Sequence, residues 1–146
     1  KPAEPSRCTL ALAAAEEMQE HFGINVEVVD LQTLNPLDVN GVAQESIERI
    51  GRVLFLDEDY ANGAISMIAK TFLQDRVADD GNPLIYATES VRTLTSPEHK
   101  PCYGEDGGFF SKPQVYDIVE SAVGLWNDSL PTGRPPIDLP WTGKDD

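Results

Sequence analysis

The chain has 146 residues, of which 40% are hydrophobic and 25% are charged, and it carries a formal net charge of −14. That length suits one domain with a single core, and no apolar run approaches the roughly 20 residues needed to span a bilayer. The acidic excess would repel phosphate backbones and anionic membranes, so neither nucleic acid nor a membrane is expected as a partner. With only Cys8 and Cys102 and no apolar leader, we expect a cytoplasmic protein with reduced thiols.

The first predicted element is a helix that starts after Ser6 and ends before Gly23. The stretch is filled with strong helix formers, and its apolar side chains recur on one face. Serine is a preferred N-cap and glycine a preferred left-handed residue after a helix, so both ends are marked. Segment 24–31 follows at once, is rich in β-branched residues and is expected to be a strand. The apolar helix face comprises Leu10, Ala14, Met18 and Phe22.

A second helix and strand are expected between residues 38 and 57. Asp38 follows a proline turn and can cap a helix that Gly51 closes. Residues 52–57 include a continuous apolar run, which is typical of a strand covered by helices on both faces. The strand ends in the acidic cluster Asp57, Glu58 and Asp59. The predicted buried stripe of the helix is Val39, Val42, Ala43, Ile47 and Ile50.

A third helix is expected over residues 64–73, followed by a turn and a strand over 84–88. Between residues 89 and 110, prolines and glycines break any periodicity, although 91–94 could form a short strand. This stretch is therefore interpreted as a long loop. The apolar stripe of the third helix is Ile65, Ile68, Ala69, Phe72 and Leu73.

The last predicted helix follows Ser111, with Pro113 in its first turn and Gln114 completing a capping box. Residues 127–146 contain four prolines and are expected to form no regular element. The predicted organisation is an N-terminal remnant or linker over 1–6, an α/β domain over 7–126 and a Pro-rich tail over 127–146. The helix stripe is Val115, Ile118, Val119, Ala122, Val123 and Trp126.

The alternation of strands and helices predicts a three-layer α/β/α sandwich with a mainly parallel sheet. Its main strands would lie near Val26, Val53 and Leu84 and run parallel.

Two stretches resemble the C-terminal domain family of transketolases. Residues 30–38 read Asp-Leu-Gln-Thr-Leu-Asn-Pro-Leu-Asp, and only Gln32 departs from a family signature that carries arginine there. The helix after it leads into Gly-Arg-Val-Leu-Phe-Leu-Asp-Glu-Asp over 51–59, which is also similar to the family. The likeness extends over about residues 7–126 and is strongest to the beta subunit of 2-oxoacid dehydrogenase decarboxylase components.

The resemblance implies a domain that catalyses nothing by itself and binds no cofactor. The parent enzyme would be an oxidoreductase that decarboxylates a 2-oxoacid, or a ketol transferase, using thiamine diphosphate and Mg²⁺ held by other domains. The domain would supply surface for subunit assembly, as a homodimer or with other subunits. A further implied partner is the subunit-binding domain of the acyltransferase core, which a charge of −14 would suit if it is basic. The implied interface candidates are Leu31, Leu34, Asp57, Glu58 and Tyr60.

Family members carry a central strand before the first helix, where this chain has residues 1–6 with two prolines. Proline lacks a ladder donor, so these residues cannot serve as that strand. The strands near Val26 and Val53 would then pair directly, or a second copy would cover the exposed surface. We expect a dimer, formed by apolar residues around Leu31, Leu34 and Tyr60.

Two other classes stay open on the residues alone. Asp30 and the cluster 57–59 would lie at neighbouring strand ends, where paired carboxylates can hold Mg²⁺. That arrangement suits an independent ligand-binding or receiver-like phosphotransfer module, although Glu89 stands where such a module needs lysine. A pyruvate-ferredoxin oxidoreductase-type domain is the other alternative.

The remaining candidate residues favour structural roles. His21 and His99 have no neighbouring ligands in the sequence, and Cys8 and Cys102 lack Cys-x-x-Cys spacing. The turn 61–64 could cradle an anion, but it has neither a Walker lysine nor a full Gly-x-Gly-x-x-Gly motif. We therefore predict no catalytic, cofactor-binding or metal-binding residue in this chain.

Overall fold

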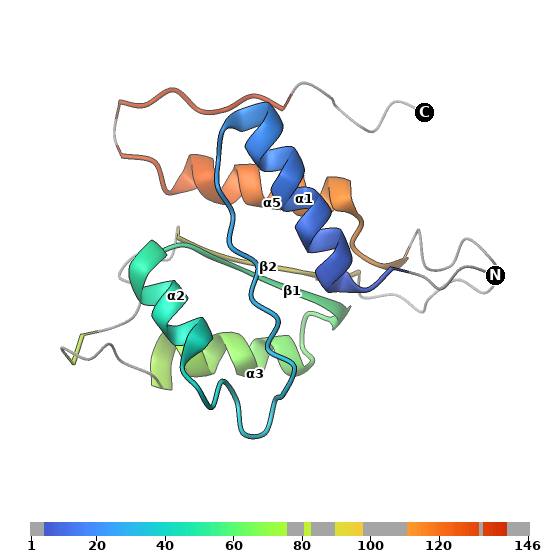
Figure 1. Ribbon diagram of the computed structural model, residues 1–146, viewed down its shortest axis with the longest axis vertical. Coiled ribbons are helices and arrows are strands. Elements are labelled where there is room, and N and C mark those ends of the chain that lie inside the picture. The colour runs from blue at the N-terminus through green and yellow to red at the C-terminus, as the bar shows by residue number, and fades with distance from the viewer. Residues whose placement is uncertain (1–4, 76–80, 83–89, 98–110, 132, 140–146) are drawn as a thin grey trace.

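The computed structural model describes residues 5–75, 81–82, 90–97, 111–131 and 133–139. Figure 1 shows two helical layers on either side of a sheet, with α1 and α5 on one side and α2 and α3 on the other. This is the predicted three-layer α/β/α arrangement. The elements are α1 (Arg7–Phe22), α2 (Val42–Ile50), β1 (Val53–Tyr60), α3 (Ala64–Lys70), the π-helical turn η1 (Thr71–Asp75), β2 (Val91–Ser96) and α5 (Val115–Asp128).

The two described strands, β1 and β2, pair in parallel, as the βα alternation predicts. The register runs from Val53 opposite Val91 to Leu56 opposite Leu94, and shifts before Tyr60 pairs with Ser96. The short strand considered at 91–94 is therefore present as β2. The predicted strand 84–88 lies outside the described residues.

The ends of α1 follow the predicted caps. The Ser6 hydroxyl accepts a hydrogen bond from the Thr9 amide at 3.2 Å, and Gly23 adopts a left-handed conformation with φ 65°. Three of the four predicted apolar positions, Leu10, Ala14 and Met18, are buried. Local capping signals were sufficient to place this helix because they act within one turn.

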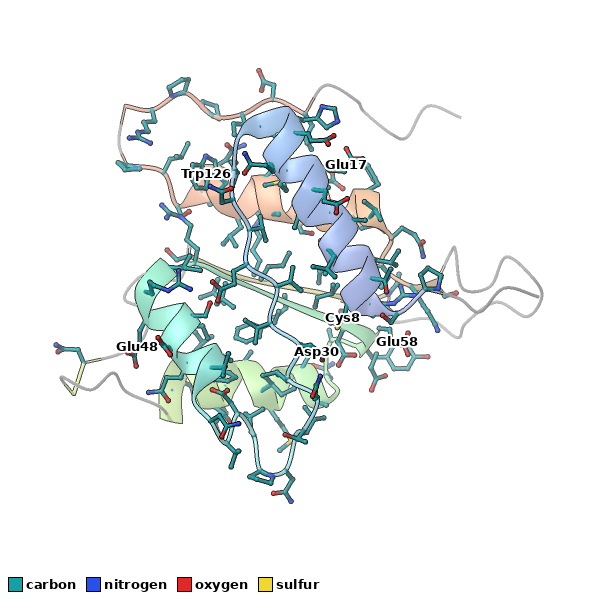
Figure 2. All side chains as sticks on the ribbon, in the orientation of Figure 1. Cys8, Glu17, Asp30, Glu48, Glu58 and Trp126 are labelled. Atoms are coloured by element: carbon teal, nitrogen blue, oxygen red, sulfur yellow. The ribbon has the colours of Figure 1, made fainter. Side chains whose placement is uncertain are left out.

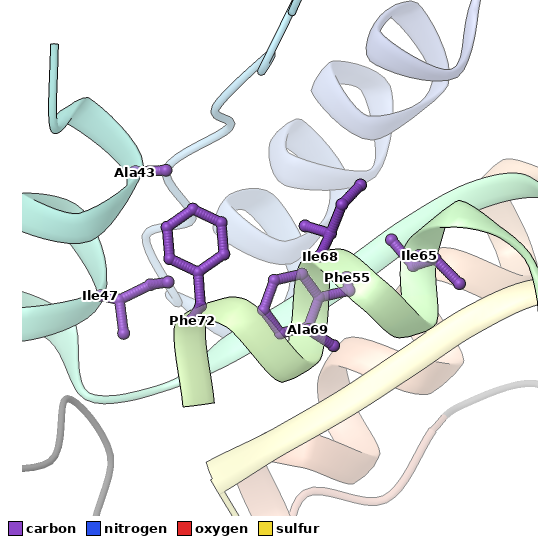
Figure 3. Close-up of a cluster of buried hydrophobic side chains, with 7 residues drawn as sticks. All are labelled: Ala43, Ile47, Phe55, Ile65, Ile68, Ala69 and Phe72. Carbon is purple, nitrogen blue, oxygen red and sulfur yellow. The ribbon is translucent and has the colours of Figure 1, made fainter. Parts of the chain in front are cut away.

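One hydrophobic cluster lies between the sheet and the α2/α3 layer, and we call it the lower cluster (Figure 3). The rings of Phe55 from β1 and Phe72 from η1 stack with their centroids 6.2 Å apart. Phe72 is 1% exposed and is among the largest fully buried side chains. The predicted stripe of the third helix therefore faces the core. The lower cluster comprises Ala43, Ile47, Phe55, Ile65, Ile68, Ala69 and Phe72.

A second cluster lies between the sheet and the α1/α5 layer, and we call it the upper cluster. Ile137 and Leu139 from the tail pack against it. Asn127 holds this part of the tail: its amide nitrogen donates to the Ile137 carbonyl at 2.9 Å, and its amide oxygen accepts from the Ile137 nitrogen at 2.8 Å. The buried members of the upper cluster are Leu10, Ala14, Met18, Ile24, Ile118, Val119 and Val123.

The strand predicted at residues 24–31 is wrong. Segment 24–31 joins no ladder, and we call it the crossing segment because it passes from the α1/α5 layer to the α2/α3 layer in front of β1 (Figure 1). Ile24 is buried in the upper cluster, whereas Val29 and Leu31 pack against the lower cluster. The segment has strand propensity but joins no ladder, and β1 pairs with β2 alone among the described strands.

Two helix starts differ from the prediction. The second helix begins at Val42 with Gly41 as N-cap, yet the Asp38 carboxylate still accepts hydrogen bonds from the Ala43 and Gln44 amides, each at 3.0 Å. Asp38 thus still caps backbone amides at the start of α2, although it is not the N-cap residue that the sequence pattern predicts.

The last helix starts at Val115, and Gln114 rather than Ser111 is its N-cap. Gln114 and Asp117 form a reciprocal capping box, in which the Asp117 carboxylate accepts the Gln114 amide at 2.8 Å. Asp117 can therefore do what the predicted Ser111–Gln114 box would have done one turn earlier.

The predicted buried stripe of α2 is correct only for Ala43 and Ile47. Val39 is 70% exposed, Val42 55% and Ile50 38%. Because the helix starts at residue 42, Val39 falls in the preceding turn and no longer shares the helical face. The α2/α3 layer therefore carries exposed apolar side chains.

Candidate functional site

The acidic end of β1 forms ion pairs with residues at the start of α1 and just before α5. The Glu58 carboxylate lies 3.6 Å from Nε of Arg7 and 3.2 Å from Nζ of Lys112. Arg7 begins α1, and its guanidinium also donates to the Pro113 carbonyl at 2.6 Å. Ser96 of β2 donates to the Glu58 carbonyl at 2.6 Å. Glu58 therefore organises this end of the sheet between α1 and α5 (Figure 2).

Asp57 and Asp59 accept hydrogen bonds from their own turn. The Asp59 amide donates to Oδ1 of Asp57 at 3.3 Å, and the Tyr60 amide donates to Oδ1 of Asp59 at 2.8 Å. A Cβ at Gly63 would lie 2.9 Å from Oδ2 of Asp59, so the turn closes tightly over this carboxylate. These oxygens therefore cap backbone amides of the turn.

Asp30, predicted to share a site with this cluster, has a different neighbour. Its carboxylate accepts the Gln32 amide at 3.2 Å and lies against the Cys8 thiol. Among the described residues, no group of three or more His, Cys, Asp or Glu side chains is placed to hold a metal ion. Asp30 and the cluster 57–59 therefore form no such group among the described residues.

Partial burial raises the pKa of the Cys8 thiol, and the hydrogen bond and negative charge of Asp30 raise it further. Nucleophilic cysteines need the opposite shift, because the thiolate is the reactive form. Cys8 is therefore suited to packing rather than catalysis. Cys102 and His99 lie outside the described residues, and His21 forms an i,i+4 pair with Glu17 at 3.1 Å.

A mostly apolar cavity of about 330 Å³ lies between the crossing segment and β1. Cys8, Ala11 and Ala15 line it from α1, and their spacing places them on one helical stripe. Val53 to Leu56 line it from β1. The only signal of this cavity in the sequence is the stripe of small residues on α1. We call it the edge cavity because it lies along the side of β1 that pairs with no described strand.

The five predicted interface residues divide into two groups. Leu31 is half-buried against the lower cluster, and Asp57 and Glu58 make the contacts described above. Leu34 is 56% exposed and Tyr60 is 39% exposed. The structure adds two exposed apolar side chains from the predicted buried stripe of α2. They are Val39 and Val42.

Comparison with known proteins shows the class to which this fold belongs. Residues 6–99 match the family model described as "Transketolase, C-terminal domain". The match covers more than half of the chain, so the chain belongs to the transketolase C-terminal domain family. No solved structure matches the chain.

Curated relatives narrow the likeness within that family. Three of them are named pyruvate dehydrogenase E1 component subunit beta. The Chlorokybus atmophyticus protein is 30% identical over 118 residues, which is 78% of this chain and 30% of that protein. The Rhizobium meliloti protein is 26% identical over 117 residues, or 80% of this chain and 24% of that protein. The Bacillus subtilis protein is 35% identical over 66 residues, which is 45% of this chain and 20% of that protein.

The chain spans 24% and 30% of the length of the first two relatives that it matches. None of the described helices is long and apolar enough to cross a membrane.

Proposed function

We propose that this chain is a non-catalytic assembly domain of a thiamine-diphosphate-dependent 2-oxoacid dehydrogenase decarboxylase component or a transketolase-like enzyme. Membership of the transketolase C-terminal domain family and the likeness to pyruvate dehydrogenase E1 beta subunits support the proposal. The parent enzyme would be an oxidoreductase acting in the cytoplasm, and this domain would join its subunits.

The residues described do not fit a role in holding thiamine diphosphate or Mg²⁺. Glu58 is engaged by Arg7 and Lys112, and the Asp57 and Asp59 oxygens accept backbone amides. The family's Gly-Asp-Gly motif with a following Asn-Asn does not occur anywhere in the sequence. The cofactor would therefore be held by other domains of the parent enzyme.

The proposed assembly role rests on exposed apolar side chains in the 34–42 region. Leu34, Val39 and Val42 are 56%, 70% and 55% exposed, and all lie within the turn before α2 or at its start. Apolar side chains gathered on one stretch of surface are typical of protein interfaces. Burying a leucine contributes about 1.5–3 kcal/mol, so one side chain can decide whether a weak dimer forms.

The second proposed partner is the subunit-binding domain of an acyltransferase core. The chain's charge of −14 favours a basic partner and would speed association at low ionic strength. Raising the salt concentration would then weaken that contact, because surface charges more than about 8–10 Å apart are screened at physiological ionic strength.

The test is light scattering of the purified chain across micromolar concentrations. We expect a dimer that Leu34→Ser weakens about tenfold or more. Leu12→Ser is a matched control, because Leu12 is also 56% exposed but lies on α1. A monomer at every concentration, or equal effects of the two substitutions, would refute assembly through this surface.

A further inference from the structure

We infer that Asn40 is a site of spontaneous modification, at which the backbone nitrogen of Gly41 converts the asparagine to aspartate and isoaspartate, and that the isoaspartate form loosens the start of α2. The reaction needs no enzyme and no cofactor. This inference concerns a covalent change in the chain, and it does not depend on the assembly role proposed above.

The residue that follows each asparagine decides whether this reaction is open to it. The chain has six asparagines. Two of them precede proline, which has no backbone N–H with which to attack. Two others precede residues with a side chain, which hinders the approach of the backbone nitrogen. Glycine has no Cβ and allows the approach. The two asparagines that precede glycine are Asn40 and Asn62.

The step begins with an attack of the Gly41 nitrogen on Cγ of Asn40. The nitrogen loses its proton to water or hydroxide and forms a bond to Cγ, and the C–N bond of the side-chain amide breaks and releases ammonia. The product is a cyclic succinimide. Water then adds to either carbonyl of the ring, so the chain reopens as aspartate or as isoaspartate. Water is consumed and ammonia is released, and no oxidant or reductant is required.

The two candidate asparagines differ in how they are held. The side chain of Asn40 is exposed, and Asn40 forms no hydrogen bond or ion pair with any residue in the described part of the chain. Asn62 is also exposed, but it has an interacting partner. The side-chain amide of Asn40 is therefore freer to rotate toward the following backbone nitrogen.

The surroundings of the two glycines differ more. The Gly41 amide donates to the Asp38 carbonyl and the Gly63 amide to the carbonyl of Tyr60, both at 2.9 Å, so in each turn this hydrogen bond must open before the attack. A Cβ built on Gly41 meets no heavy atom within 4 Å. A Cβ built on Gly63 lies 2.9 Å from Oδ2 of Asp59. The turn at Gly63 must therefore displace a carboxylate, whose negative charge also opposes loss of the amide proton.

The isoaspartate product changes the backbone before α2. It adds a methylene carbon to the main chain between Asp38 and the helix. The Asp38 carboxylate accepts hydrogen bonds from the Ala43 and Gln44 amides, each at 3.0 Å, and both depend on the path of the residues between them. A longer path moves the acceptor away from these amides, which then exchange with water more readily. The aspartate product keeps the original backbone length and leaves both caps in place.

The first experiment follows deamidation of the purified chain by peptide mass spectrometry during incubation at mildly alkaline pH. We expect residue 40 to deamidate about tenfold faster than residue 62 in the folded chain. In urea the two should react at nearly equal rates, because each then has only its following glycine. Asn40→Gln should abolish the change in its own peptide and leave residue 62 unaffected. An isoaspartyl methyltransferase should label the residue 40 peptide of the incubated chain.

The second experiment measures amide hydrogen exchange by NMR in the isoaspartyl chain, separated by chromatography. We expect exchange at Ala43 and Gln44 to speed up about tenfold relative to the unmodified chain. Asn40→Asp is the matched control, because it introduces the same charge without lengthening the backbone, and its exchange at both amides should stay unchanged.

Three results would overturn the inference. Deamidation of residue 62 as fast as residue 40 in the folded chain would mean that the room around Gly41 does not control the reaction. A mass change at residue 40 without methyltransferase labelling would mean direct hydrolysis by water, with no attack by Gly41. Unchanged exchange at Ala43 and Gln44 in the isoaspartyl chain would mean that α2 tolerates the longer backbone. A chain that stays monomeric would refute the assembly role alone, so the two proposals fail separately.

Discussion

Filling the edge cavity should stabilise the isolated chain, which is the opposite of what the same substitution does in a packed core. The change is Ala11→Leu, on the stripe of α1 that faces the cavity. Alanine and leucine have similar helix propensities, so the helix itself is little affected. The new side chain would extend into space bounded by Val53 to Leu56 and the crossing segment.

The size of the effect follows from the volume available. Leucine adds three carbons, and each buried methylene contributes about 0.8 kcal/mol, which sets an upper limit of about 2.4 kcal/mol. The cavity of about 330 Å³ is far larger than a leucine side chain, so overpacking is not expected. The cavity is partly open to solvent, so the measured gain in the free energy of unfolding should lie below the limit. We expect about 1–2 kcal/mol.

The assay is urea unfolding followed by circular dichroism, with the transition midpoint compared at constant slope. Ala69→Leu is the control, because Ala69 is 8% exposed in the lower cluster and does not line the cavity. Overpacking at that position should cost about 1–3 kcal/mol. If Ala11→Leu destabilises the chain as much as Ala69→Leu does, the edge cavity is not open space and the reasoning fails.

Three further changes test other parts of the structure. Phe72→Ala should cost about 3–5 kcal/mol in urea unfolding, because Phe72 is fully buried, and a loss below 1 kcal/mol would contradict the lower cluster. Asn127→Ala removes both hydrogen bonds to Ile137, so limited proteolysis should cut the tail faster while the rest of the chain stays resistant. The hydrogen bond from Arg49 lowers the pKa of Glu27 in the folded chain. The stabilisation by this pair is therefore fully present above the pKa of Glu27 in the unfolded chain, and it is lost as the pH falls through the lower pKa of Glu27 in the folded chain. Arg49→Gln should raise that pKa in an NMR titration, and an unchanged carboxyl titration would show that the pair is not formed in solution. Finally, calorimetry should detect no micromolar binding of thiamine diphosphate to the chain, and such binding would overturn the non-catalytic assignment.

Local signals predicted the elements whose ends depend on one turn of chain. Ser6 and Gly23 bound α1 as expected because a cap hydrogen bond and a left-handed glycine act within a few residues. The third helix buries Ile65 and Ile68 because its apolar spacing leaves one face for the core. The same logic failed at Ser111, where Asp117 offered a competing capping box one turn later.

The candidate site could be predicted only in part. The acidic residues at the end of β1 were visible in the sequence, but the partners of Glu58 were not, because Arg7 at the start of α1 and Lys112 before α5 are far from it in the chain. Asp30 was expected beside this cluster on the assumption that segment 24–31 forms a strand. Once the segment crosses between layers, the Asp30 carboxylate lies beside Cys8.

The amino-acid pattern alone was enough for the fold class, the parallel strand at Val53, most helix faces and the family. Those features depend on residues near one another in sequence or on a motif that can be compared directly. Tertiary structure decided the path of segment 24–31, the edge cavity and the exposed valines before and in α2. Strand formation needs a second backbone that propensity cannot supply, so residues 24–31 have the composition of a strand and no ladder.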